Sequence, residues 1–175
     1  MSKAGRWLLH PHERRPPGVA NSEEYTITTT QTHDDLQIRE LFADQATAMQ
    51  AKDAERVLSQ YAPDVVKFDL APPLRQSGAD ALDANALRSW FARFDGPIYY
   101  ETKELAVSVG DDVAFCHGLS RLSATPEGSP DQFAMWFRMS AGLRKIGGSW
   151  RIVHEHKSTP FYMDGSFKAA IDLQP

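Results

Sequence analysis

The chain has 175 residues, of which 42% are hydrophobic and 24% are charged, and its formal net charge is −4 at pH 7. This composition predicts one folded domain with a single core and is too apolar for a disordered chain. Proteins that work on nucleic acid usually carry a basic excess, so no nucleic-acid partner is expected. The apolar runs are too short to cross a membrane, and the single cysteine, Cys116, excludes an intrachain disulfide and a zinc site built on several thiolates. We therefore expect a cytoplasmic protein.

The sequence divides into a flexible tail, residues 1–30, and a folded domain, residues 31–175. Met1–Ser22 is rich in proline and glycine and is expected to lie outside the core, as an extended tail or as an arm that packs on a partner subunit. From His33 onwards, apolar residues recur at spacings of three and four, which predicts a helix with Gln45 on its apolar stripe. The stripe consists of Leu36, Ile38, Leu41, Phe42, Ala46 and Met49.

Further elements follow in chain order. Asp34 resembles the start of a capping box, and Asp53 is a candidate N-cap for a second, short helix. This helix would turn Tyr61 inwards and end at Pro63. A strand is predicted over Val65–Asp69, and a third helix over about Leu82–Phe94. The remaining predicted strands are Ile98–Val109, Val113–Ala124, Phe133–Lys145 and Trp150–Ser158.

This order of elements predicts an α+β fold. Three N-terminal helices would pack on one face of a strongly curved, mostly antiparallel sheet. The space between helices and sheet would then form a cone, and a cone of this kind is a natural pocket for a small molecule.

Several segments resemble one known family. Residues 142–161, GLRKIGGSWRIVHEHKSTPF, look like the closing hairpin of SnoaL-like proteins, and Phe68–Pro73 and Asp112–Leu122 extend the resemblance over residues 34–175. SnoaL-like proteins belong to the nuclear transport factor 2-like superfamily, with ketosteroid isomerase and polyketide cyclases as relatives. The segment WRIVHEHKS also resembles the last strand of the calcium/calmodulin-dependent protein kinase II association domain. The resemblance implies the cone-shaped fold but no single reaction, because this fold hosts enzymes, binders and scaffolds.

The resemblance to ketosteroid isomerase places Asp69 at the position of that family's proton-shuttling aspartate. A carboxylate that faces an apolar cone is desolvated, which would raise its pKa and make it a better general base. Alternatively, Asp69 only caps the turn before Pro72. The oxyanion-hole tyrosine and aspartate of the isomerase correspond to Gln45 and Ser140, so steroid isomerisation is not expected. Gln45 is either a buried amide that needs a partner or a polar residue at the edge of the stripe.

The glycine pair Gly147–Gly148 predicts a two-residue hairpin turn, with Ile146 opposite Ser149. Continued without interruption, this register divides the side chains into two sets. The set expected to face the pocket, by resemblance to the isomerase, is Trp136, Arg138, Ser140 and Glu155, with Cys116, Gly118 and Ser120 added from the preceding strand. The set expected on the outer face, as a homodimer surface, is Trp150, Ile152, His154 and His156.

Two of these assignments leave alternatives open. Arg138 is a candidate either for binding a ligand carboxylate or for an internal ion pair with Glu155. His154 and His156 project to the same side of one strand, so a metal could bridge them, with His117 as a third ligand. Packing is favoured over a metal, because Trp150 shares their predicted face, and no metal and no cofactor are expected.

The sequence therefore predicts a protein whose cone binds a small, largely apolar molecule with a polar head. As an enzyme, it would perform acid–base chemistry without a cofactor, namely isomerisation, cyclisation, hydration or dehydration, with Asp69 as the base. The alternative is a non-catalytic ligand-binding or assembly module. Cys116 is expected to be a buried, inert thiol rather than a nucleophile.

Overall fold

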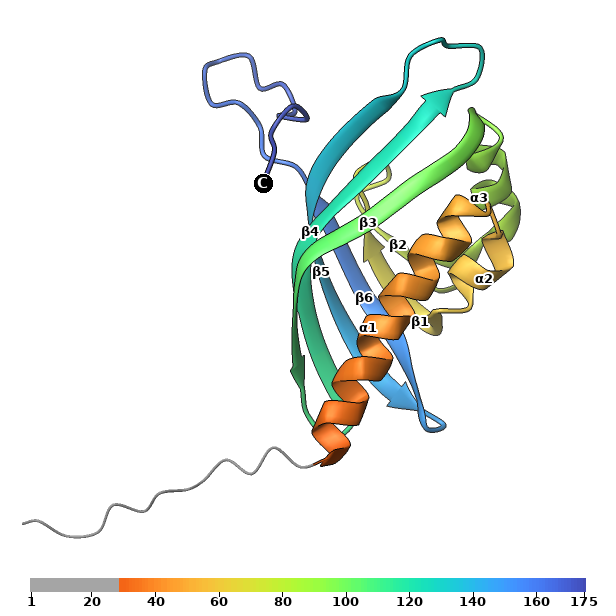
Figure 1. Cartoon of the computed structure of the whole chain (residues 1–175), viewed down its shortest axis with the longest axis vertical. Helices are drawn as coiled ribbons and strands as arrows, with labels where there is room; N and C mark the ends of the chain where they lie inside the picture. Colours follow the sequence, from red (N-terminus) through yellow and green to blue (C-terminus); the bar gives the residue numbers. More distant parts are fainter. Residues whose placement is uncertain (1–28) are drawn as a thin grey trace, which may run out of the picture.

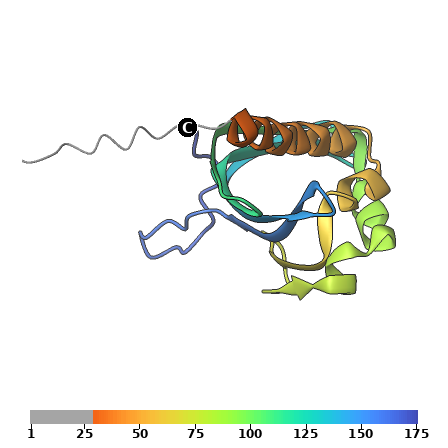
Figure 2. The ribbon, with the colours of Figure 1, turned by 90° about the horizontal axis from the view of Figure 1, so that it is seen from below.

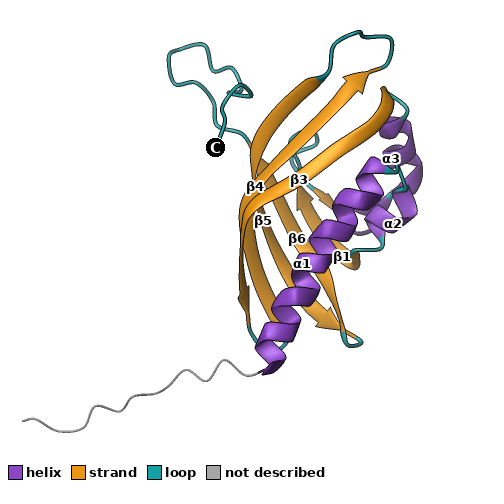
Figure 3. Cartoon of the chain, in the orientation of Figure 1, coloured by secondary structure: helices purple, strands orange, loops and turns teal. Residues whose placement is uncertain are grey.

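A computed structural model describes residues 29–175 of the chain, with side chains from His33 onwards, so the predicted arrangement of Met1–Ser22 lies outside the described residues. Within the described range, an α+β fold combines three α-helices, one 3-10 helix and a six-stranded sheet (Figures 1 and 3). The elements are α1 (Thr29–Gln50), α2 (Ala54–Leu58), β1 (Tyr61–Phe68), β2 (Gln76–Ser77), η1 (Gly78–Leu82), α3 (Ala84–Phe91), β3 (Phe94–Val109), β4 (Val113–Pro126), β5 (Phe133–Ile146) and β6 (Ser149–Ser158).

The three helices occur in the predicted order, with a strand between the second and the third, but their ends differ from the prediction. β1 and β2 lie between α2 and α3 in the sequence, so the three helices do not all precede the sheet. The side chain of Asp53 accepts from Arg56 N at 3.0 Å, which confirms it as the N-cap of α2. The third helix begins two residues later than predicted, after Asp83, whose carboxylate accepts from the backbone at its N-terminus.

Helix α1 packs mainly against β3 and lies along the concave side of the sheet (Figure 2). Its predicted stripe is largely confirmed, because Ile38 and Phe42 are buried, and Gln45 is buried with them. Burial of each large apolar side chain contributes about 1.5–3 kcal/mol. Leu36 is an exception and is exposed. Asp34 lies within the helix rather than at its start, so it does not form the predicted cap.

The sheet has the strand order β2-β1-β6-β5-β4-β3. β3 to β6 form the predicted antiparallel meander, whereas β1 joins β6 in parallel. Proline at 63 does not end a helix as predicted, because β1 begins at Tyr61 and includes this residue. This earlier start puts Tyr61 into the sheet, where its side chain is buried.

The curvature of the sheet has a local cause at Gly118. The ladder between β3 and β4 shifts register between Lys103 and Ala106, where Glu104 adopts a φ of 54°. A Cβ added to Gly118 would lie 2.9 Å from the backbone oxygen of Lys103. Glycine is therefore required where the bulge brings the two backbones together, and bulges of this kind bend a sheet.

A second bulge changes the faces of the hairpin between β5 and β6. The predicted register holds from Ile146–Ser149 to Leu143–Ile152, but beyond it Gly142 pairs with His154. A bulge inserts one extra residue into one strand, so every side chain beyond it moves to the opposite face. The uninterrupted register predicted from the turn is therefore wrong for the second half of β6.

Before the bulge the register is as predicted, but the face assigned to the outside is the concave one. Trp150 and Ile152 are buried in the core and do not form an outer, dimer-forming face. Glu155 is buried as well, whereas Arg138 is exposed on the other side of the sheet, so the predicted pair of Arg138 with Glu155 does not form.

Candidate functional site

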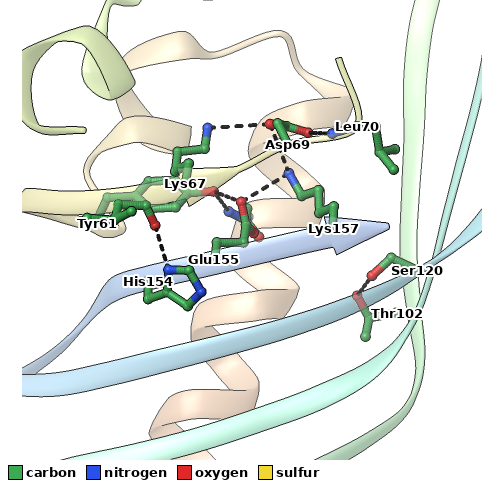
Figure 4. A network of polar contacts seen from close by, with 11 residues as sticks. Tyr61, Lys67, Asp69, Leu70, Thr102, Ser120, His154, Glu155 and Lys157 are labelled. Carbon is green, nitrogen blue, oxygen red and sulfur yellow. Dashed lines mark hydrogen bonds and ion pairs between the residues drawn. The ribbon is translucent and has the colours of Figure 1, made fainter. Parts of the chain in front are cut away.

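A chain of polar contacts crosses the interior between α1, β1 and β6 (Figure 4). Gln45 of α1 donates from Nε2 to the Tyr61 hydroxyl at 2.8 Å, and Tyr61 of β1 donates in turn to Oε2 of Glu155 at 3.0 Å. Lys157 Nζ lies 3.0 Å from the same Oε2. Gln45 is thus a buried amide with a hydrogen-bond partner, and not a polar residue at the edge of the apolar stripe.

The contacts continue outwards to Asp69. Its Oδ2 lies 3.7 Å from Lys157 Nζ and 3.8 Å from Lys67 Nζ, and its Oδ1 accepts from the backbone N of Leu70 at 2.8 Å. Asp69 therefore extends this chain of polar contacts and also binds the backbone of the turn that follows β1. We call Gln45, Tyr61, Lys67, Asp69, Glu155 and Lys157 the interior cluster.

The predicted rise in the pKa of Asp69 is wrong. Burial raises this pKa, but the positive charges of Lys157 and Lys67 lower it by more, so the net pKa lies below the usual value for aspartate. Arg138 lies on the other face of the sheet, so the charges that lower the pKa of Asp69 are those of the two lysines. Asp69 is therefore an ionised ion-pair partner and a weaker base than predicted.

The other titratable groups of the interior cluster have clear charge states. Burial lowers the pKa of Lys157, but Glu155 and Asp69 raise it by more, so Lys157 remains an ammonium ion. Burial, followed by the nearby Glu155, raises the pKa of Tyr61 well above 10.0, so the phenol stays protonated and donates a hydrogen bond. Outside the interior cluster, burial also raises the pKa of Tyr100. The charge of Lys157 opposes this rise, and the charge of Glu155 adds to it.

One atom of this site remains without a partner. Among the residues that the structure describes, Oε1 of Glu155 is buried and makes no hydrogen bond. A buried acceptor without a hydrogen bond costs about 1–3 kcal/mol. Such an oxygen is a place where the donor group of a ligand would lower the free energy of the complex.

The burial of the interior cluster increases in steps from its outer end. The exposed fraction of the side chain falls from 31% at Asp69 to 15% at Lys157 and 2% at Glu155. The hydroxyls of Ser120 and Thr102, 3.2 Å apart, come from β4 and β3 on the same concave side. Asp69 and Lys157 thus form the solvent-facing end, and Glu155 forms the buried end.

The described part of the chain has two cavities whose walls contain no residue of the interior cluster. One, of about 330 Å³, includes Tyr100 and the ion pair of Glu101 with Arg121 in its wall. The other, of about 310 Å³, lies where α1 faces the start of β6 and includes Gln37 and Trp150.

The structure separates the predicted site residues into two groups. Gln45, Asp69 and Glu155 belong to the interior cluster, and Ser120 is buried on the same concave side. Three others lie on the outer face. They are Arg138, which is exposed, Ser140, which pairs with His156, and Trp136, whose Nε1 donates to Gln174 Oε1 at 3.0 Å and whose ring lies below Lys103 Nζ.

Tyr61, Lys67 and Lys157 were not predicted as site residues. Tyr61 was assigned to the end of a helix, and the one local signal for a strand was that tyrosine itself is enriched in strands. Lys67 and Asp69 are two residues apart at the end of β1, and this spacing places both on one side of a strand. Lys157 is two residues from Glu155 on β6, so the same spacing places the two side chains on one side of that strand.

The two strand histidines pack with an aromatic ring. Phe68 lies 5.0 Å from His154 and 5.7 Å from His156 between ring centroids, and His154 Nδ1 lies 3.0 Å from Val66 O. Across residues 33–175, no three histidine, cysteine, aspartate or glutamate side chains are grouped as a metal ion would require. Burial raises the pKa of Cys116 to about 12, as expected of an inert thiol.

A curved six-stranded sheet with α1 along its concave side is the fold of nuclear transport factor 2-like proteins. Residues 38–162 match the family model of the SnoaL-like domain, so this chain belongs to the SnoaL-like family. It is similar to an NTF2-like protein of unknown function from Pseudomonas putida KT2440, with 30% identity and a TM-score of 0.71 over 82% of this chain and 98% of that one.

Two further solved structures show the range of this fold. A ketosteroid isomerase-like protein from Erwinia carotovora atroseptica SCRI1043 is 25% identical, with a TM-score of 0.58 over 70% of this chain and 93% of that one. A protein with the provisional name scytalone dehydratase, from Novosphingobium aromaticivorans DSM 12444, is 15% identical, with a TM-score of 0.69 over 82% and 95%. No curated protein matches this sequence. Within residues 29–175, no helix is long and apolar enough to cross a lipid bilayer.

Proposed function

We propose that this chain is an acid–base enzyme that acts, without a cofactor, on a small and largely apolar molecule with a carbonyl or hydroxyl head group. The reaction would be an isomerisation, cyclisation, hydration or dehydration. The observation that carries this proposal is Oε1 of Glu155, which is buried and accepts no hydrogen bond from residues 33–175, beside the cationic Lys157.

The proposal moves the role of base from Asp69 to Glu155. Oε2 of Glu155 is held by Tyr61 and Lys157, so Oε1 is oriented and available to accept a proton from carbon or from a hydroxyl group. The Lys157 ammonium would stabilise the negative charge that develops on the substrate oxygen. Asp69, paired with two lysines, would position Lys157 rather than take the proton.

The protonated phenol of Tyr61 supports the same division of roles. Its hydroxyl donates to Glu155 while accepting from Gln45, so rotation of the carboxylate is restricted. The names of two relatives, a ketosteroid isomerase-like protein and a dehydratase, show that acid–base enzymes have been assigned to this fold.

A non-catalytic binding or assembly module is the second candidate. The observation in its favour is that Lys67, Lys157, Asp69 and Glu155 compensate one another's charges without a ligand. One structural neighbour, from Xanthomonas campestris, is named for the calcium/calmodulin-dependent protein kinase II association domain. We keep the homodimer as part of the proposal, but through the outer face, where Phe115 is exposed beside His117.

Turnover of a panel of small enolisable ketones, β-hydroxy ketones and epoxides tests the proposed reaction. For a substrate that is turned over, Glu155→Gln should lower kcat by about 10²–10⁴-fold, the usual contribution of a general base. Arg138→Gln, on the outer face, is the matched control and should keep full turnover. Binding without turnover would favour the binding module, and the absence of both would reject the interior cluster as a ligand site.

A further inference from the structure

Two lysines of the interior cluster share one carboxylate oxygen. Lys67 Nζ, from β1, and Lys157 Nζ, from β6, lie 3.8 Å and 3.7 Å from Oδ2 of Asp69 (Figure 4). Lys157 also has Glu155 as a partner at 3.0 Å. Of the two ammonium groups, Lys157 is therefore the better compensated, and Lys67 is the one that can lose its proton more readily.

The surroundings of Lys67 also favour loss of the proton from its ammonium group. Its side chain is only 14% exposed, and its Nζ lies 5.1 Å from the centroid of the Tyr61 ring. The charged groups that face it are Lys157 and Glu155 from β6 and Asp69 from the end of β1. Burial, followed by the charge of Lys157, lowers the pKa of Lys67, and these effects exceed the opposing influence of Glu155 and Asp69.

We propose that Lys67 is a nucleophilic amine that forms a Schiff base with a small aldehyde or ketone. Lysines become nucleophilic when they are desolvated or when they lie next to a second cation, and Lys67 meets both conditions. This inference rests on the proposed function in one respect, because it also requires a carbonyl compound to reach the interior cluster. It adds a covalent intermediate to that function.

The bond changes balance without an oxidant or reductant. The neutral Lys67 nitrogen attacks the carbonyl carbon, the carbon–oxygen π bond breaks, and the oxygen takes up a proton to give a carbinolamine. The nitrogen gives up one proton, the hydroxyl oxygen takes up a second proton and leaves as water when the carbon–oxygen bond breaks, and the nitrogen then gives up its remaining proton to form the imine. Asp69 lies within 4 Å of Lys67 Nζ and is placed to receive a proton from nitrogen, and Lys157 is placed to donate one to oxygen.

The test is the reaction of the purified full-length chain with pentane-2,4-dione at neutral pH. This diketone condenses with neutral amines to give an enaminone that absorbs in the ultraviolet. We expect one enaminone per chain to form first, and peptide mass mapping to place it on Lys67. Modification of Lys67 no faster than that of Lys103, an exposed lysine on the outer face, would overturn the proposal.

Variants separate this inference from the proposed function. Lys67→Arg keeps the charge and should lose the early enaminone while retaining the circular dichroism spectrum, whereas Lys103→Arg should keep it. Lys157→Met should slow the modification, because Lys67 then becomes the only cation facing Asp69 and Glu155. Diketone that binds at Glu155 in NMR titrations without an adduct on Lys67 rejects the nucleophile and leaves the proposed function standing. No binding in those titrations and no adduct would reject both.

Discussion

The two halves of β6 use the concave side of the same sheet in different ways. Before the bulge, Trp150 and Ile152 point inwards and belong to the apolar core. After the bulge, Glu155 and Lys157 point inwards and form ion pairs. Without the bulge, the strand would place His154 and His156 inside instead. One inserted residue therefore exchanges two histidines for a carboxylate and an ammonium group.

The energetic contrast between the halves is equally clear. Burying the apolar half is favourable, by about 1.5–3 kcal/mol for each large side chain. Burying the charged half requires desolvation of each ion, which pairing only partly offsets. A charged, incompletely paired cluster in the interior is therefore poorly explained by stability alone. This difference favours function as the reason for the second half.

The largest effect is expected on removing the buried carboxylate. Glu155→Ala leaves Lys157 with only the longer contact to Asp69 and removes the acceptor of the Tyr61 hydroxyl. Breaking a buried ion pair costs about 3–5 kcal/mol, so urea unfolding should show a loss within this range. Glu155→Gln, which keeps the shape, should lose less. A loss below about 1 kcal/mol for Glu155→Ala would contradict the contrast between the two halves.

The apolar half of β6 should respond as a core. Ile152→Ala is expected to lower the free energy of unfolding by about 2–5 kcal/mol, because a fully buried side chain is truncated and a cavity is left. Chemical denaturation provides the measurement, with exposed His156→Ala as the control on the other face. A small loss together with dissociation of a dimer would restore the original prediction that Ile152 lies on an interface.

A smaller, pH-dependent effect is expected at Asp34, which joins α1 to the hairpin. Its Oδ1 accepts from Lys145 Nζ at 2.6 Å and from Trp150 Nε1 at 3.0 Å. These bonds, first that of Lys145, lower the pKa of Asp34 below 3.8. The ionised form thus stabilises the fold above that pH, and the stabilisation is lost as the pH falls through the lowered folded-state pKa.

Asp34→Asn should accordingly cost about 1–3 kcal/mol at neutral pH, the range for a hydrogen-bonded charge. The difference from the parent chain should shrink in acid, below the usual aspartate pKa of 3.8. Unfolding curves at several pH values measure it, with Asp35→Asn as the surface control. A stability difference that grows as the pH falls would contradict the predicted pH dependence.

The smallest effect is expected at Arg138. The side chain is exposed on the outer face, away from the interior cluster, so Arg138→Ala should change the free energy of unfolding by no more than about 0.5 kcal/mol. Ligand binding and turnover should also be unchanged. Loss of either, with the fold intact, would return Arg138 to the site and contradict its assignment to the outer face of β5.

Much of the fold could be predicted from local patterns. Periodicity gave the stripe of α1 around Ile38 and Phe42, and Gly147–Gly148 gave the turn and the first pairs of the hairpin. The bulge could not be predicted, because it depends on how β6 pairs with both β5 and β1. The alternation of Glu155 and Lys157 is the same in either register and does not reveal which face is inside.

The site could be predicted only in part for the same reason. Asp69 and Gln45 were found by resemblance to the isomerase, and their places on β1 and α1 do not depend on the bulge. Arg138 and Ser140 were also assigned to the pocket by that resemblance, but they lie on the outer face of β5. The pKa of Asp69 could not be predicted because Lys157 reaches it only through the parallel pairing of β1 with β6.

Amide chemical-shift mapping by NMR, during titration with a small ketone or hydroxy ketone that binds, tests the central claim most directly. The claim is that the interior cluster, and not the outer face, is the functional site. We expect the largest shifts at Tyr61, Glu155 and Lys157, with Arg138 and His156 unchanged. Shifts confined to Arg138 and His156, with the interior cluster unaffected, would contradict it.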